Sequence, residues 1–165
     1  MSKEFSFADL NREMSKISEY GDTLDKSTIS EIDHYIPTGN YHLNACLTGS
    51  LFGGYPNNRA VALAGPSGTG KTYLILNAIK QAQKQGYSIV FYDSENAVDK
   101  HLVEKFGIDA SKFRYEPCNT VQEFRSSVTA ITDVLIEQKK KGVELPKIMV
   151  VFEYAGNLAT QKEID

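Results

Sequence analysis

The spacing of apolar residues changes along the chain and divides it into two parts. In the first 30 residues, apolar side chains recur every three or four positions, at Phe7, Leu10, Met14 and Ile17. This spacing predicts one amphipathic helix with a single apolar stripe. From about residue 59 onward, short apolar runs alternate with segments of helical spacing. We therefore expect an N-terminal helical element over residues 1–30 and a separate core over residues 31–165.

The second part reads as alternating strands and helices. Four apolar runs are typical of strands: 60–64, 87–92, 113–116 and 147–152. Helices are expected between them: about 72–84, about 98–106, and from 121 to the lysines at 139–141. Thr120 and Glu123 have the spacing of a capping box at the start of the last helix. This alternation and the almost unbroken apolar last strand predict an α/β fold with a parallel sheet covered by helices on both faces.

The most specific pattern lies between the first expected strand and the first helix of the core. It reads Gly65-Pro66-Ser67-Gly68-Thr69-Gly70-Lys71-Thr72. Every required position of the phosphate-binding pattern G-x-x-x-x-G-K-[ST] is satisfied, in a strand–loop–helix context. Glycines let backbone N–H groups point at phosphates, and the helix N-terminus adds partial positive charge. We expect these eight residues to bind ATP or GTP, with Lys71 on the β- and γ-phosphates and Thr72 on Mg²⁺.

Acidic residues follow two of the expected strands. Asp93 and Glu95 end the run at 87–92, and Glu153 ends the last one. Because the carboxyl ends of parallel strands meet at one edge of a sheet, these residues should converge on the phosphate loop. We expect Glu95 to position the attacking water, alongside Lys71 as the second catalytic residue, and Glu153 to serve with Thr72 at the metal. Asp93 is equally consistent with a catalytic role and with capping the next helix.

Composition narrows the remaining possibilities. The chain has 165 residues, 41% hydrophobic and 24% charged, which is ordinary for one soluble domain. Its net charge of −3 gives no overall attraction to nucleic acid, and the lysines at 139–141 suit a solvated helix end. No apolar run approaches the roughly 18 residues of a membrane span, and no secretory signal is visible. We expect a cytoplasmic protein without membrane contact.

Several segments together resemble the RecA-like recombinases, and most closely the tailed-phage branch represented by UvsX. The likeness rests on six segments in the same order: 36–39, 53–54, 65–72, 91–95, 106–109 and 156–159. The resemblance implies an ATP-dependent recombinase that forms filaments on single-stranded DNA and promotes strand exchange in homologous recombination and DNA repair. It maps the family's catalytic glutamate onto Glu95 and its phosphate-loop residues onto Lys71 and Thr72.

The same resemblance implies partners and a location. The N-terminal helix of such proteins docks on the next protomer, which would explain the stripe in residues 1–30 and make the protein a homo-oligomer or filament. For a phage-encoded protein the compartment is the host cell cytoplasm.

The sequence departs from the family in two ways. An Asp-Ser pair is usual after the fourth strand, where this chain has Glu153 and Tyr154. The chain also stops at Asp165, about half way through such a recombinase, so the two DNA-binding loops are expected outside it. We expect a RecA-like ATP-binding core truncated after the fourth core strand, and a DNA-dependent ATPase once the missing half is supplied.

Two alternatives stay open. The first is a truncated ATP-binding fragment or filament partner that does not hydrolyse ATP, which the change at Glu153 and Tyr154 favours. The second is a small phosphoryl-transfer kinase, which needs clustered arginines in a lid. The arginines of this chain are scattered, at Arg12, Arg59, Arg114 and Arg125, which argues against the kinase.

Overall fold

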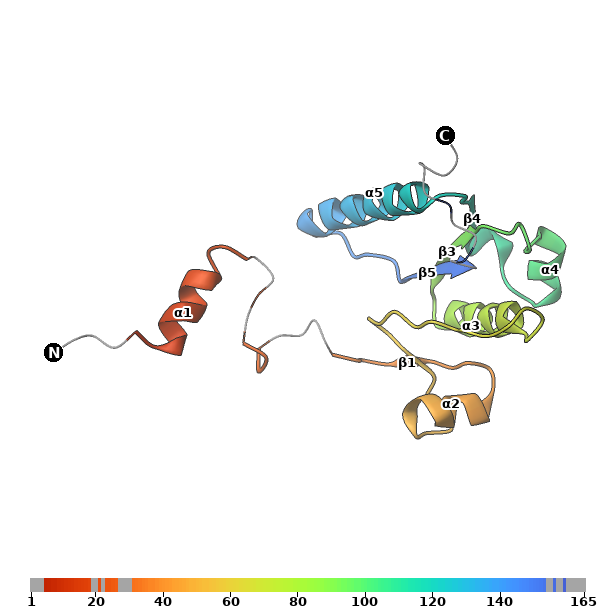
Figure 1. Ribbon diagram of the computed structural model, residues 1–165, viewed down its shortest axis with the longest axis horizontal. Coiled ribbons are helices and arrows are strands. Elements are labelled where there is room, and N and C mark those ends of the chain that lie inside the picture. Colours follow the sequence, from red (N-terminus) through yellow and green to blue (C-terminus); the bar gives the residue numbers. More distant parts are fainter. Residues whose placement is uncertain are drawn as a thin grey trace.

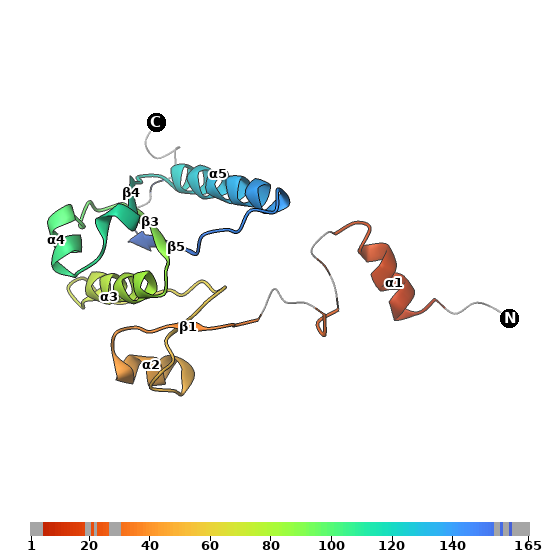
Figure 2. The same ribbon diagram turned by 180° about the vertical axis from the view of Figure 1, so that it is seen from behind.

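A computed structural model describes residues 5–18, 21, 23–26, 31–153, 156 and 159. Figures 1 and 2 show its elements from opposite sides. In chain order they are α1 (Phe7–Met14), β1 (Tyr35–Ile36), α2 (Tyr41–Thr48), β2 (Tyr55–Pro56), α3 (Lys71–Lys84), β3 (Ser88–Asp93), α4 (Lys100–Lys105), a 3-10 turn η1 (Ala110–Lys112), β4 (Phe113–Pro117), α5 (Val121–Lys140) and β5 (Ile148–Glu153).

A three-stranded parallel sheet forms the centre of the fold, in the order β4-β3-β5. Helices α3 and α5 lie on opposite sides of it (Figure 1). This arrangement confirms the α/β class and the covered parallel sheet. Because successive side chains of a strand point to opposite faces, the central strand β3 supplies both halves of the core.

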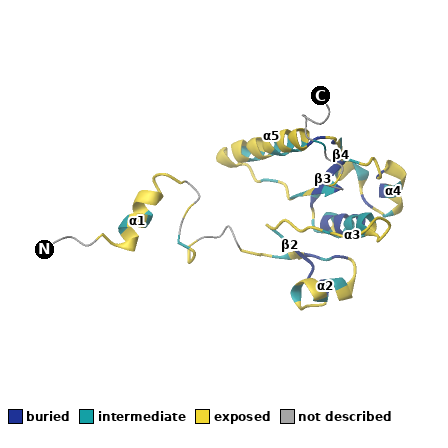
Figure 3. Ribbon diagram, in the orientation of Figure 1, coloured by how far each residue is buried: buried dark blue, intermediate teal, exposed yellow. Residues whose placement is uncertain are grey.

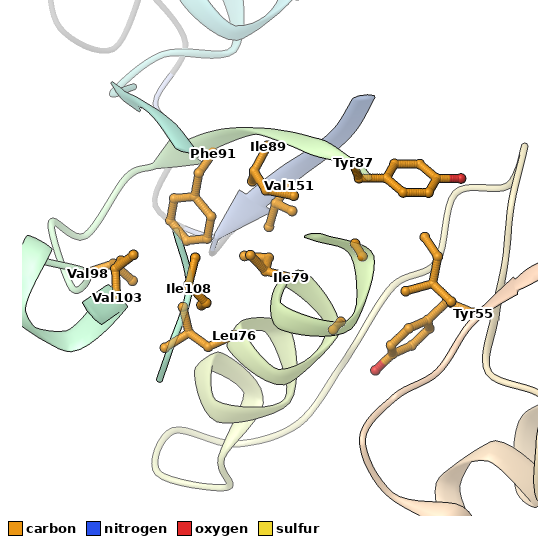
Figure 4. Close-up of a cluster of buried hydrophobic side chains, with 13 residues drawn as sticks. Tyr55, Leu76, Ile79, Tyr87, Ile89, Phe91, Val98, Val103, Ile108 and Val151 are labelled. Carbon is orange, nitrogen blue, oxygen red and sulfur yellow. The ribbon is translucent and has the colours of Figure 1, made fainter. Parts of the chain in front are cut away.

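The two faces of β3 pack differently. On one face, Ile89 and Phe91 contact Leu76 and Ile79 of α3 (Figure 4). On the other face, Val90 and Tyr92 pack against the apolar side of α5. The aromatic rings of Tyr92 and Phe124 meet edge to face, with centroids 5.0 Å apart. The apolar run of β3 is therefore buried on both sides, as expected for the central strand of a parallel sheet.

The expected capping box of the last helix is present. The backbone N–H of Glu123 donates to the Thr120 hydroxyl, and the backbone N–H of Thr120 donates to the Glu123 carboxylate, each at 3.1 Å. The backbone N–H groups of Asn119 and Thr120 both donate to the Glu123 carboxylate and lower the pKa of Glu123. Helix α4 is shorter than the expected range of about 98–106 and has Asp99 as its N-cap.

The expected strand at residues 60–64 is a wrong prediction, since the structure gives this segment no strand pairing. Three of its five residues are alanines, which have low strand propensity and bury little apolar area. Leu63 packs against the core, while Val61 is 45% exposed. Among the described residues, the sheet therefore has three strands instead of four, and Val150 on its edge strand β5 is 46% exposed.

The segment before residue 60 holds an element that the sequence analysis did not foresee. Helix α2 begins after Asn40, whose side chain accepts a hydrogen bond from Leu43 N–H at 3.1 Å. Buried Asn44 accepts from both the backbone and the hydroxyl of Thr38, at 2.9 and 2.8 Å. Strands β1 and β2, which precede and follow this helix in the sequence, form an antiparallel pair. The short strands explain why no clear periodicity marked them.

The N-terminal helix α1 stands apart from the sheet in both views (Figures 1 and 2). It begins at a capping box between Ser6 and Asp9, and Ile17 of the expected stripe lies just beyond its end. The stripe residues are exposed, and Figure 3 shows the helix almost entirely in the colour of exposed residues. The amphipathic helix is thus present, while its docking on another protomer stays a prediction.

Candidate functional site

The phosphate loop leads directly into α3. Gly68 and Gly70 have φ angles of 76° and 86°, in the left-handed region that favours glycine. Gly70 is the N-cap of α3, and no side chain caps the helix. The first backbone N–H groups of α3 are therefore not satisfied by a capping side chain, as in anion sites at helix N-termini. The loop is exposed to solvent, so an anion can approach it.

Lys71 folds back over the loop. Its ammonium donates to the backbone oxygens of Gly65 and Pro66, both at 2.9 Å. The Thr69 hydroxyl donates to Pro66 O at 2.8 Å and tightens the same turn. An ionised acceptor forms stronger hydrogen bonds with an ammonium than a neutral carbonyl does. A phosphate oxygen in the loop would therefore compete well for Lys71.

Thr72 joins the start of α3 to the end of β5. Its hydroxyl donates to Oε1 of Glu153 at 2.6 Å. Glu153 is only 4% exposed, and its second oxygen, Oε2, is buried without a hydrogen-bond partner. Leaving a buried acceptor unpaired is unfavourable, so this oxygen is available to a ligand.

The charge state of Glu153 reflects this environment. Burial raises the pKa of Glu153, the Thr72 hydroxyl lowers it, and the negative charges of Asp93 and Glu95 raise it further. Lys71 acts in the opposite direction. The charges of two carboxylates and one ammonium thus act on the pKa of Glu153 at one edge of the sheet.

The residues at this edge fit Mg²⁺. This cation prefers oxygen ligands and is usually held by one or two protein side chains together with water and phosphate oxygens. The Thr72 hydroxyl and the unpaired oxygen of Glu153 provide two such ligands. Within the part of the chain that the structure describes, no group of three or more His, Cys, Asp or Glu side chains is arranged to hold a metal. Two oxygen ligands from these residues would leave the other positions around a magnesium ion to further oxygen ligands such as water.

Asp93 lies beside Glu153, as its register partner at the end of β3. It is 1% exposed. Its carboxylate accepts hydrogen bonds from the backbone N–H groups of Glu95 at 2.9 Å and Val98 at 3.2 Å. The expected capping of the next helix is wrong, because Asp99 is the N-cap of α4, and Asp93 instead holds the turn that follows β3.

The structure brings together most of the predicted site residues. Lys71 contacts the loop and Thr72 contacts Glu153. Glu95 lies on the exposed turn after β3, close enough for its charge to raise the pKa of Glu153. Tyr154, which stands where the family usually has a serine, lies outside the described residues.

Sequence analysis missed Tyr115 of β4. Its hydroxyl donates to Asp93 at 3.1 Å. Tyr115 is the register partner of Phe91, so it shares a face with Asp93 two residues further on. No motif surrounds Tyr115, and only the strand order, which the sequence does not state, reveals this contact.

No helix in the described ranges is both long enough and apolar enough to cross a lipid bilayer.

Comparison with known proteins adds a family likeness. Residues 6–156 match the family model described as the RecA N-terminal domain. The chain is 36% identical over 88 residues to Protein RecA of Lactobacillus delbrueckii subsp. bulgaricus, covering 53% of this chain and 26% of that protein. It is 43% identical over 74 residues to Protein RecA of Bacteroides thetaiotaomicron, and this match covers 45% of this chain and 22% of that protein. It is 38% identical over 93 residues to Protein RecA of Acholeplasma laidlawii, and this match covers 56% of this chain and 26% of that protein. The matched stretches thus span about a quarter of these relatives.

Proposed function

This chain belongs to the RecA family of recombinases by its match to the N-terminal domain, and on this premise we propose that it binds ATP together with Mg²⁺. The loop Gly65–Thr72 is the phosphate site, with Lys71 on the β- and γ-phosphates. Thr72 and Glu153 hold the metal. Glu95 positions the water that attacks the γ-phosphate.

One observation carries this proposal. The hydroxyl of Thr72 and the carboxylate of Glu153 meet at 2.6 Å, and the other carboxylate oxygen of Glu153 is buried and unpaired. These groups come from residues 81 positions apart in the sequence. A buried carboxylate with a purely structural role would have partners on both oxygens, whereas a site for a divalent cation leaves ligands available.

The groups at this edge of the sheet have separate roles in the proposed chemistry. Bound Mg²⁺ neutralises charge on the phosphates. The N–H groups at the start of α3 bind phosphate oxygens, and Lys71 exchanges its carbonyl partners for them. Glu95 orients water at the same sheet edge. The exposed position of Glu95 leaves room for that water.

We extend the proposal to the whole recombinase. Together with the remaining part of a RecA-type protein, the chain would act as a DNA-dependent ATPase. It would form filaments on single-stranded DNA and exchange strands in recombination and repair. The exposed stripe of α1 supports self-association, since an unpartnered apolar face favours burial against another surface. We include in this extension that the protein acts in the cytoplasm and that it is related most closely to the phage recombinases.

Binding of ATP by purified chain tests the core of the proposal. Isothermal titration with ATP and Mg²⁺ should give saturable binding, and Lys71→Ala should weaken it by about tenfold or more because a charged phosphate contact is lost. Lys84→Ala, at the far end of the same helix, is the matched control and should bind as the wild type does. Equal affinities for the two variants would refute the assignment of the loop.

A second function is favoured by the identity of Glu153. Its side chain is one methylene longer than the aspartate usual at this position in the family, which shifts the carboxylate relative to the metal and suits a subunit that binds ATP without hydrolysing it. Turnover assays with and without single-stranded DNA separate the two functions. ATP binding with no turnover under either condition would select the non-hydrolysing subunit.

A further inference from the structure

The carboxylate of Asp93 receives hydrogen bonds from both ends of the turn that carries Glu95. Oδ1 accepts from Glu95 N–H at 2.9 Å, and Oδ2 accepts from Val98 N–H at 3.2 Å. Val98 is itself buried in the core beneath the turn (Figure 4). One buried side chain therefore fixes the beginning and the end of the turn.

Tyr115 adds a third contact from the neighbouring strand. Its hydroxyl lies 3.1 Å from Oδ2 of Asp93 and 3.2 Å from Oδ1 of Asn96, and it donates to either oxygen. The ring is held by stacking on Phe91, with centroids 6.4 Å apart. Burial raises the pKa of Tyr115, and so does the charge of Asp93, which keeps the phenol protonated as a donor.

Asn96 shows that the turn needs such support. Its φ of 54° lies in the left-handed region, which is unfavourable for a residue with a side chain even though asparagine tolerates it better than most. The Asn96 side chain is within reach of the Tyr115 hydroxyl, and Asn96 is the residue directly after Glu95. The conformation next to Glu95 thus depends on contacts made by β3 and β4.

We propose that Asp93 and Tyr115 are positioning residues that hold Glu95 in place at the nucleotide edge. Both oxygens of Asp93 already accept hydrogen bonds, so Asp93 acts through the turn and not as a base or metal ligand. The catalytic consequence rests on the proposed function, because Glu95 matters only if ATP is hydrolysed. The placement of the turn is a property of the chain by itself.

Tyr115→Phe tests this inference, because it removes one hydroxyl and keeps the stacked ring. Tyr41→Phe removes a tyrosine hydroxyl on α2 and is the matched control. Hydrogen exchange measured by NMR should become about tenfold faster at the Glu95 and Val98 amides in Tyr115→Phe, the order expected for one lost hydrogen bond. Amides in the middle of α5 should be unchanged. Where the wild type hydrolyses ATP, kcat should fall about tenfold while KM for ATP changes less than twofold.

The outcomes separate the inference from the proposed function. Exchange at Glu95 and Val98 equal to that of Tyr41→Phe would overturn the inference, as would a uniform increase over the whole chain, which indicates lost stability only. Local acceleration with an unchanged kcat in a hydrolysing wild type would also overturn it. A wild type that binds no ATP refutes the proposed function, and the exchange pattern then still decides whether Tyr115 holds the turn.

Discussion

Two buried carboxylates lie side by side at the ends of β3 and β5, and they are supplied with hydrogen bonds very differently. Asp93 and Glu153 are register partners, 1% and 4% exposed. Asp93 accepts hydrogen bonds from two backbone N–H groups and a tyrosine hydroxyl. Glu153 accepts one from Thr72, and its other oxygen has no partner.

This difference shows how a carboxylate with a structural role can be told from one that binds a ligand when both are equally buried. A buried carboxylate with donors on both oxygens stabilises the surrounding backbone. A buried carboxylate with an unpaired oxygen is retained at a cost to stability, which suits a role with a ligand. By this criterion Asp93 organises the site and Glu153 takes part in it.

The largest effect expected from this contrast is on the structural acid. Asp93→Ala leaves the backbone N–H groups of Glu95 and buried Val98, and the Tyr115 hydroxyl, without their acceptor, and should lower the free energy of unfolding by about 3 kcal/mol. Asp99→Ala, which removes the exposed N-cap of α4, is the control and should cost about 1 kcal/mol. Urea denaturation measures both. Equal losses would show that the contacts of Asp93 are not special.

Substitution of Glu153 should change the free energy of unfolding less, and should either leave it unchanged or raise it. Glu153→Gln keeps the size of the side chain and the acceptor for Thr72, and it removes a buried charge. The free energy of unfolding should stay the same or rise by up to about 1 kcal/mol. The same urea titration checks this value. A clear loss of stability would mean that Glu153 is as structural as Asp93, and the contrast between them would fail.

The smallest effect is a difference in pH dependence. Since burial raises the pKa of Glu153, the folded chain binds a proton there more tightly than the unfolded chain. The resulting stabilisation is present at pH below the unfolded value of 4.5, and it is lost as pH rises from there through the folded pKa. The wild type should therefore lose stability relative to Glu153→Gln over this window. Parallel stability curves for the two proteins would contradict the raised pKa.

Local signals in the sequence were sufficient for much of the fold. The apolar runs predicted β3, β4 and β5 within a residue or two, and the spacing of Thr120 and Glu123 predicted the cap of α5. These features depend on neighbours in the chain. The run at 60–64 failed because a strand also needs a paired neighbour and enough apolar area, which its alanines do not supply.

The candidate site shows the same limit. The phosphate loop and Thr72 follow from a contiguous motif, and Glu153 was expected at the metal because it ends an apolar strand. The contact between Thr72 and Glu153 agrees with that placement. The contact of Tyr115 with Asp93 depends on the order β4-β3-β5, a tertiary property that no spacing in the sequence encodes.

The most direct test of the account is the Mg²⁺ dependence of ATP affinity, measured by titration of the wild type and Glu153→Gln with and without the metal. If Glu153 is a metal-side ligand, Mg²⁺ should strengthen ATP binding to the wild type, and Glu153→Gln should lose about tenfold in affinity only when Mg²⁺ is present. ATP binding that is absent from the wild type, or that responds to Mg²⁺ equally in both proteins, would contradict the claim that this edge of the sheet is a magnesium–nucleotide site.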